Sequence, residues 1–487
     1  MTTADPSTTS RPALFSAVAA RLDLIVRSLG RPDRPLTVLD PSAGDGRNNR
    51  DSPSAEPSAA VRRRLVALVR ALKPHEHWFL AAVVTATLPH ALFVDEITRA
   101  VDLSDFDRAA DLLIAAAESE GSATLPVVRV VEDAVLLDVQ GLLGTDGLGD
   151  SRRVAEEIRA SAPEGVVSVT WSAAYGSLVE ASDGSPSSSR DRDPAGTVIV
   201  PLRGVYLLPD VCDQPTRASK VMSLASGSST ATMSIGYGLG PLLDVELYDK
   251  WPDEPADDPR RFSWHLAAVR VMDRVVTVSS TAYRELAGWK SMLPALGVPG
   301  PTLVEGALGL DAVEIGPADE RPRIVLAGAD AVTADFETVV HALSLVGASE
   351  GDGASLGSKP LEVVRISAPA ESSDGSRDPF LRTAVIGHET SFRVRASDII
   401  VSMAPYSSHD VAVESLLAAG LRGVIARTGF GAELQERWSC VTVTQRDELA
   451  LADAIASAAA LPVPAQVSTD ASWKRFTDLV WSSAARL

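Results

Sequence analysis

Short apolar strand candidates alternate with helix candidates from Val127 onward, and this alternation restricts the fold of the 487-residue chain more than any other feature. Repetition of strand, helix and strand is typical of a parallel sheet that helices cover on both faces. The pattern runs to Val278 and starts again at Arg323. We therefore expect an α/β protein with two doubly wound, Rossmann-like domains that meet near residue 300 and face each other across a ligand cleft.

The chain before Val127 has a helical pattern instead. Leu14–Leu29 carries apolar residues at helical spacing, and a small helical module is predicted from Val61 to Glu120. Residues 41–60 lie between them and are rich in Gly, Ser, Asp and Pro, which favour loops. The expected organisation is a helix and flexible linker over 1–55, a helical module and interaction domain over 56–125, the two Rossmann-like domains over 126–300 and 301–465, and a C-terminal helix over 466–487.

Composition excludes several classes of protein. The chain has 45 Lys and Arg residues against 64 Asp and Glu residues, a net charge of −19, so we expect no nucleic acid partner. Cys212 and Cys440 are too few for a disulfide framework or a four-thiolate zinc site. No stretch approaches the roughly 20 apolar residues that span a bilayer, and residues 1–12 lack the apolar core of a signal peptide. The sequence predicts a cytoplasmic protein with no transmembrane segment, no metal and no cofactor.

Five blocks between Val135 and the C-terminus carry a resemblance to a known family. They are Leu136–Ile158, Ser234–Tyr248, Met272–Leu286, Arg321–Leu343 and Ala396–Ala426. Their order and spacing resemble the retaining glycosyltransferases with two Rossmann domains (the GT-B type), specifically the family-4 class.

That resemblance implies a donor site in the second domain, which would hold a nucleotide-diphosphate sugar, and an acceptor side in the first domain. Gly149 and Arg152 fall in the glycine loop on the acceptor side. It also implies a C-terminal helix that packs back on the first domain, and a role in surface-polysaccharide or glycoprotein assembly.

The donor-site positions depart from the family pattern. The family places an Arg and a Lys after the glycine of the second domain's first strand, and after Gly328 these positions fall on Thr333 and Ala334. Of the family's two glutamates, the first falls on Tyr406 and the second is kept as Glu414.

The acceptor side departs from the family pattern as well, because Tyr237 and Gly238 replace a His and an Asp.

Transfer of the sugar needs cationic side chains at the donor site, since negative charge accumulates on the leaving diphosphate. We therefore expect a non-catalytic partner or regulatory subunit, which binds an active glycosyltransferase or a second copy of itself. The alternative is an active retaining enzyme that takes its cation from another loop, at Arg382, Arg393, Arg395 or Arg427.

Several further signals have two interpretations. Glu414 would accept hydrogen bonds from a ribose or would be a carboxylate favoured at a helix N-terminus. The backbone at Gly429 and Gly431 would approach a nucleotide or form a simple turn. His409-Asp410 is explained by helix capping, and His75-Glu76-His77 by an exposed turn, since no matching cluster completes a metal site.

Overall fold

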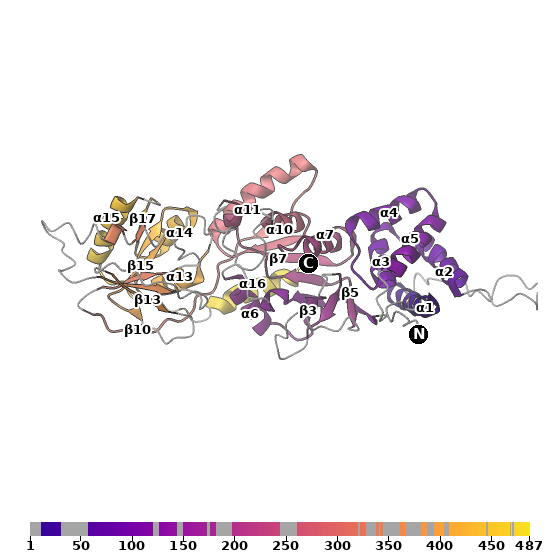
Figure 1. Ribbon diagram of the computed structural model, residues 1–487, viewed down its shortest axis with the longest axis horizontal. Coiled ribbons are helices and arrows are strands. Elements are labelled where there is room, and N and C mark those ends of the chain that lie inside the picture. Colours follow the sequence, from indigo (N-terminus) through magenta and orange to yellow (C-terminus); the bar gives the residue numbers. More distant parts are fainter. Residues whose placement is uncertain are drawn as a thin grey trace, which may run out of the picture.

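The computed structural model describes most of the helices and strands of the chain. The described residues are 11–30, 57–119, 126–143, 150–172, 176–181, 197–243, 261–319, 322–327, 338–339, 341–343, 361–366, 381–386, 394–403, 409–444, 447–467, 469 and 472–487. Three parts follow one another along the long axis of the molecule: a helical module, a first lobe built on one sheet, and a second lobe built on another (Figure 1).

In the part of the helical module that the structure describes, the chain forms five α-helices. They are α1 (Arg11–Leu29), α2 (Pro57–Ala71), α3 (His77–Thr85), α4 (Ala91–Asp102) and α5 (Phe106–Ser119), with a 3-10 turn at Pro74–Glu76. Every residue of α3 is buried, as expected for a helix that is apolar on all sides. His75 and Glu76 lie in the 3-10 turn before this helix, as predicted, but His77 is the first residue of α3 and is buried, so the prediction of an exposed turn was wrong for His77. Burial lowers the pKa of His77.

The module and the first lobe share one apolar core. Buried residues from α1 to α5 belong to the same cluster as those on one face of the first sheet. Trp78 is fully buried, and its Nε1 donates to Ser223 Oγ on α7 at 3.1 Å. Arg21 Nη1 on α1 donates to the carbonyl oxygen of Val84 at 2.9 Å.

The first lobe is built on a nine-stranded sheet in the order β1-β5-β4-β3-β2-β6-β7-β8-β9. All neighbouring strands are parallel except β4, which is antiparallel to β3 and β5. The strands are β1 (Val128–Glu132), β2 (Val135–Asp138), β3 (Val167–Trp171), β4 (Leu178–Glu180), β5 (Val198–Leu202), β6 (Val205–Leu208), β7 (Ala231–Gly236), β8 (Arg274–Thr277) and β9 (Thr302–Val304).

Helices cover both faces of this sheet. The helices of this lobe are α6 (Ser151–Ala160), α7 (Pro215–Gly227), α8 (Gly240–Leu243), α10 (Arg261–Val269) and α11 (Ser280–Met292), and 3-10 turns lie at Gln140–Leu142 and Leu293–Leu296. Apolar residues of α7, α10 and the module form the core on one face, and those of α6 form the core on the other. The chain leaves β2 toward β3 and later returns to β6 on the opposite side of β2. The β2–β6 boundary is thus a topological switch point, where open α/β sheets place their ligands.

The second lobe is built on a six-stranded parallel sheet in the order β13-β12-β11-β15-β16-β17. This is the doubly wound order of dinucleotide-binding domains, with its switch point between β11 and β15. The strands are β11 (Ile324–Leu326), β12 (Leu361–Ile366), β13 (Leu381–Ile386), β15 (Ile399–Ser402), β16 (Arg422–Ala426) and β17 (Cys440–Val443). Helices α13 (Val411–Ala418) and α14 (Gly429–Arg437) pack on one face, and α15 (Glu448–Ala460) packs on the other. A separate short pair joins β10 (Ile315–Gly316) and β14 (Val394–Arg395).

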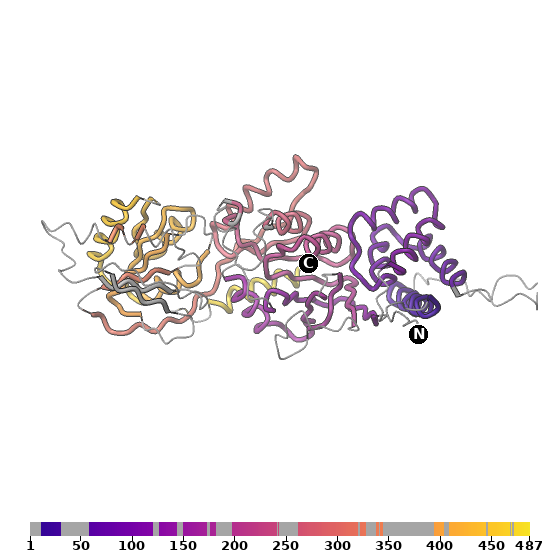
Figure 2. Tube along the Cα trace, in the orientation of Figure 1, coloured from indigo at the N-terminus to yellow at the C-terminus, as the bar shows by residue number. Residues whose placement is uncertain are grey.

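The last helix, α16 (Ser472–Ala484), returns to the first lobe (Figure 2). Phe476 and Val480 of α16 are buried in the same cluster as Ile158 of α6. Trp481 Nε1 donates to Ser161 Oγ at 3.1 Å. The fold class expected from the sequence, two Rossmann-like α/β units preceded by a helical module, is confirmed by this topology. None of the described helices combines the length and the apolar character that a membrane span requires.

Candidate functional site

A cleft lies between the two lobes, at the carboxyl ends of their strands. The first lobe lines it with Val278, Ser279, Ala307 and Leu308, and the second lobe with His409, Asp410, Val411, Glu414, Phe430, Glu433 and Arg437. The cleft has a cavity volume of only about 10 Å³. Ligand pockets for small molecules usually measure about 300–1,000 Å³, so the cleft in this arrangement is far smaller than such pockets.

Glu414 lies on α13, and its carboxylate is paired with side chains of α14 and of the residue that follows it. Arg437 Nη1 is 2.6 Å from Glu414 Oε1, and Trp438 Nε1 donates to the same oxygen at 3.3 Å. Burial raises the pKa of Glu414, and the Arg437 charge opposes this. The prediction of a carboxylate in the first turn of a helix is confirmed, and its carboxylate also lines the cleft.

Charge in the cleft is predominantly acidic. Among the described residues that line it, Arg437 is the one Lys or Arg, and it is also 3.8 Å from Glu433. The Glu433 carboxylate accepts hydrogen bonds from Thr281 of the first lobe. The cation that could meet a diphosphate is thus already paired with two glutamates of its own lobe.

His409 is half-buried between the lobes. Its ring lies 5.3 Å from the ring of Tyr237, at a tilt of 45°. Burial lowers the pKa of His409, while the charges of Asp150 and Glu285 and the backbone of Tyr237 act in the opposite direction. Next to it, Asp410 caps α13 by accepting from the Val413 N–H at 2.9 Å, as the sequence predicted.

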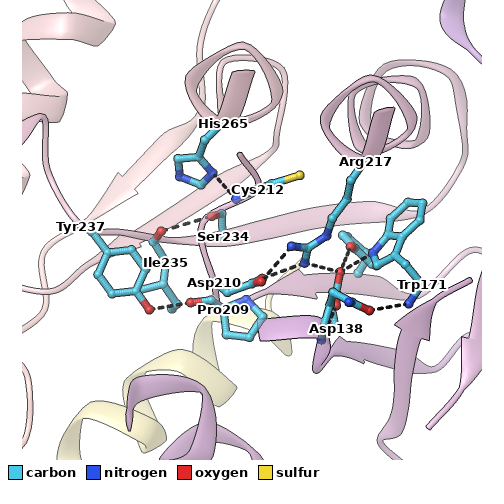
Figure 3. A network of polar contacts seen from close by, with 12 residues as sticks. Asp138, Trp171, Pro209, Asp210, Cys212, Arg217, Ser234, Ile235, Tyr237 and His265 are labelled. Carbon is cyan, nitrogen blue, oxygen red and sulfur yellow. Dashed lines mark hydrogen bonds and ion pairs between the residues drawn. The ribbon is translucent and has the colours of Figure 1, made fainter. Parts of the chain in front are cut away.

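Tyr237 and Gly238 follow β7, at the carboxyl edge of the first sheet. The Tyr237 hydroxyl donates to the carbonyl oxygen of Pro209 at 2.5 Å (Figure 3). Burial raises the pKa of this phenol. Gly238 has φ +89°, a left-handed conformation that favours glycine. The Tyr237 hydroxyl is therefore engaged in holding its own lobe together.

Gly429 and Gly431 lie in the first turn of α14, so the interpretation as a simple turn was wrong. Thr428 caps this helix through a bond from the Gly431 N–H at 3.1 Å. A Cβ on Gly431 would lie 2.1 Å from the carbonyl oxygen of Ala426, and a Cβ on Gly429 would lie 3.1 Å from Thr281 Cγ2. Close packing of α14 on β16 and on the first lobe thus accounts for both glycines.

The remaining predicted site residues lie away from the cleft or outside the described residues. Arg152 is on α6 and pairs with Glu156 at 3.2 Å. Arg395 pairs with Asp319 at 2.7 Å, and Arg427 is exposed after β16. Gly149, Gly328, Thr333, Ala334, Arg393 and Tyr406 lie outside the described residues, as does the side chain of Arg382.

A buried polar network that the sequence analysis missed fills the switch point of the first sheet (Figure 3). Arg217 of α7 makes two bonds of 2.8 Å to Asp210 and one of 2.8 Å to Asp138. Asp138 also accepts from Trp171 Nε1 at 2.7 Å and from the Tyr206 hydroxyl. Asp138 ends β2 and Asp210 lies two residues after β6, so two acidic residues at neighbouring strand ends were the signal in the sequence.

This network is a structural plug. The side chains of Arg217, Asp138 and Asp210 are 4%, 0% and 7% exposed. Their charges therefore pair with one another inside the protein and do not face a ligand. Burial opposes the charge of Arg217, but Asp138 and Asp210 raise its pKa well above its ordinary value. Burial raises the pKa of Asp210, and Arg217 works against that shift. Among the described residues, no group of three His, Cys, Asp or Glu side chains is arranged to hold a metal ion.

Among family models, curated proteins and solved structures, only solved structures are similar to the chain. No protein-family model matches the chain, and no curated protein matches it either. Among solved structures, a sucrose-phosphate synthase from Thermosynechococcus elongatus has 13% identity and a TM-score of 0.40, over 74% of this chain and 97% of that one. An α,α-trehalose 6-phosphate synthase from Burkholderia multivorans has 11% identity and a TM-score of 0.37, over 73% and 95%. A UGT transferase from Siraitia grosvenorii, solved in complex with UDP, has 11% identity and a TM-score of 0.34, over 73% and 95%. At these values the likenesses say nothing about what the cleft of this chain binds.

Proposed function

We propose that this chain is a glycosyltransferase-like protein of the GT-B type that has lost donor turnover and serves as a non-catalytic partner or regulatory subunit in glycan or glycoprotein assembly. The two facing Rossmann-like lobes and the blocks quoted above support the family. The observation that carries the loss of turnover is the charge of the cleft, where Arg437 is already paired with Glu414 and Glu433.

A nucleoside diphosphate gains negative charge as the sugar departs, and preorganised cations supply several kcal/mol of the stabilisation this requires. To serve a diphosphate, Arg437 would have to leave Glu414, whose carboxylate is buried. An unpaired buried carboxylate is costly, so the exchange is unfavourable.

The alternative function is an active retaining glycosyltransferase that transfers a sugar from a nucleotide-diphosphate sugar to a glycan or protein acceptor. The presence of Glu414 in the lining of the cleft favours it, because this is the position of the family's ribose-binding glutamate.

Isothermal titration calorimetry against a panel of uridine and guanosine diphosphate sugars separates the two functions. The proposal predicts no saturable heat and no release of free sugar on prolonged incubation. Saturable micromolar binding that Glu414→Ala abolishes, and that Glu436→Ala on the exposed side of α14 leaves intact, would favour the active enzyme.

A further inference from the structure

Each lobe places a carboxylate on a helix N-terminus of the other lobe. Asp150 of the first lobe, the N-cap of α6, accepts a hydrogen bond from the N–H of Val411, the first residue of α13, at 2.8 Å. In the opposite direction, Glu433 on α14 accepts from the N–H and the hydroxyl of Thr281 on α11, at 2.9 and 2.7 Å. The two contacts are reciprocal and span the interface between the lobes.

Helix N-termini suit such contacts. The first N–H groups of a helix lack an intrahelical partner and carry a partial positive charge, so a carboxylate placed there is stabilised. Bonds to a charged acceptor are stronger than neutral ones, and they gain further strength where water is excluded. Thr281 and Glu433 are only 4% and 8% exposed. Near the other contact, the half-buried ring of His409 lies beside the ring of Tyr237, and the charge of Asp150 acts to raise the pKa of His409.

The segment that connects the lobes forms hydrogen bonds with both of them. Asp311, between β9 and β10, donates its backbone N–H to Ser415 Oγ of α13 at 2.9 Å. Its carboxylate accepts from Arg153 of α6 at 3.0 Å and from Trp473 of α16 at 2.9 Å. Asp311 of the connecting segment thus contacts both lobes.

We propose that the Asp150 and Glu433 caps form a latch that holds the two lobes closed while the cleft is empty. The resting protein is then one rigid body, and the lobes separate only when both carboxylates leave their helix N-termini. This inference concerns the unliganded protein and does not depend on whether the cleft binds a nucleotide-sugar.

Spin-label distances on the full chain without ligand test the latch. Met292 at the end of α11 and Leu449 on α15 are 61% and 68% exposed, on different lobes, and each is replaced by cysteine for labelling. The native cysteines, Cys212 and Cys440, are both buried, which directs the labels to the engineered sites. Pulsed dipolar spectroscopy then gives the distribution of the distance between the lobes.

The latch predicts one narrow distribution for the otherwise unaltered chain, and a broad distribution that extends to longer distances for Asp150→Ala with Glu433→Ala. The matched control is Glu436→Ala with Asp453→Ala, which removes two exposed carboxylates from the second lobe and should keep the distribution narrow. The isosteric pair Asp150→Asn with Glu433→Gln is measured alongside, with circular dichroism, so that a misfolded alanine variant cannot decide the result. A broad distribution in the unaltered chain, or narrow distributions in folded latch variants, would overturn the proposal.

Discussion

Replacement of Arg217 by methionine tests the account of the first sheet most sharply. The change removes one positive charge and three bonds of 2.8 Å, and leaves Asp138 and Asp210 buried without a counter-charge. Removal of one partner from a buried ion pair costs about 3–5 kcal/mol. Methionine keeps much of the side-chain volume, so the loss reports charge more than packing.

Hydrogen exchange of peptides that contain β2 and β6 measures the effect locally, which suits a chain with several domains. A loss of about 3–5 kcal/mol corresponds to roughly 100- to 4,000-fold faster exchange. The loss of stability should become smaller as the pH falls, because burial raises the pKa of Asp210 and a protonated carboxyl group needs no counter-charge. The control is Arg203→Met, since Arg203 pairs with Asp133 and Glu132 on the surface and such pairs contribute at most about 1 kcal/mol. Exchange in the Arg217 variant within tenfold of the unaltered chain would refute the reasoning.

Three further predictions follow from single contacts. Gly431→Ala should destabilise the second lobe by about 1–3 kcal/mol, since the new Cβ would lie 2.1 Å from the Ala426 carbonyl oxygen. Gly429→Ala should destabilise it less, because its Cβ would lie 3.1 Å from the Thr281 methyl group. Equal losses of stability in urea unfolding would contradict this. Burial lowers the pKa of His409, so the unfolded chain binds the proton more readily than the folded chain. Thermal stability should therefore fall as the pH drops below about 6.5. A His409→Gln variant whose thermal stability depends on pH in the same way would exclude this residue as the cause. Trp78→Ala should cost about 3–5 kcal/mol and speed exchange in both α3 and α7, which its side chain joins; an effect confined to the module would argue against a shared core.

The sequence predicted the α/β alternation well because each buried strand is a short apolar run. Ile399–Ser402, for example, is buried along its whole length and lies in the second half of the alternation, which starts at Arg323. Helices α11 and α14 were missed because they bury only three and four residues, several of them polar or glycine, so neither has a clear apolar stripe at helical spacing. Thr428 caps α14 through the Gly431 N–H, and the residues that form this cap are of the same types as those that form a turn.

The candidate site could be predicted only in part. Glu414 was found from the family pattern, yet its partner Arg437 lies on a helix that was not predicted. The Asp150 and Glu433 contacts pair residues 261 and 152 positions apart, across two lobes. A single sequence has no local signal for such a pairing. Hydrophobic periodicity reports which face of an element is buried, and not which element covers it.

Among the described residues that line the cleft, Arg437 is the one Lys or Arg, and its pairing with Glu414 and Glu433 leaves no positive side chain available for a diphosphate. A crystal structure after soaking with uridine or guanosine diphosphate tests this most directly. The account predicts that Arg437 stays on Glu414 and that no diphosphate is bound between α13 and α14. Electron density for both phosphates, held by an arginine or lysine of this chain, would contradict it.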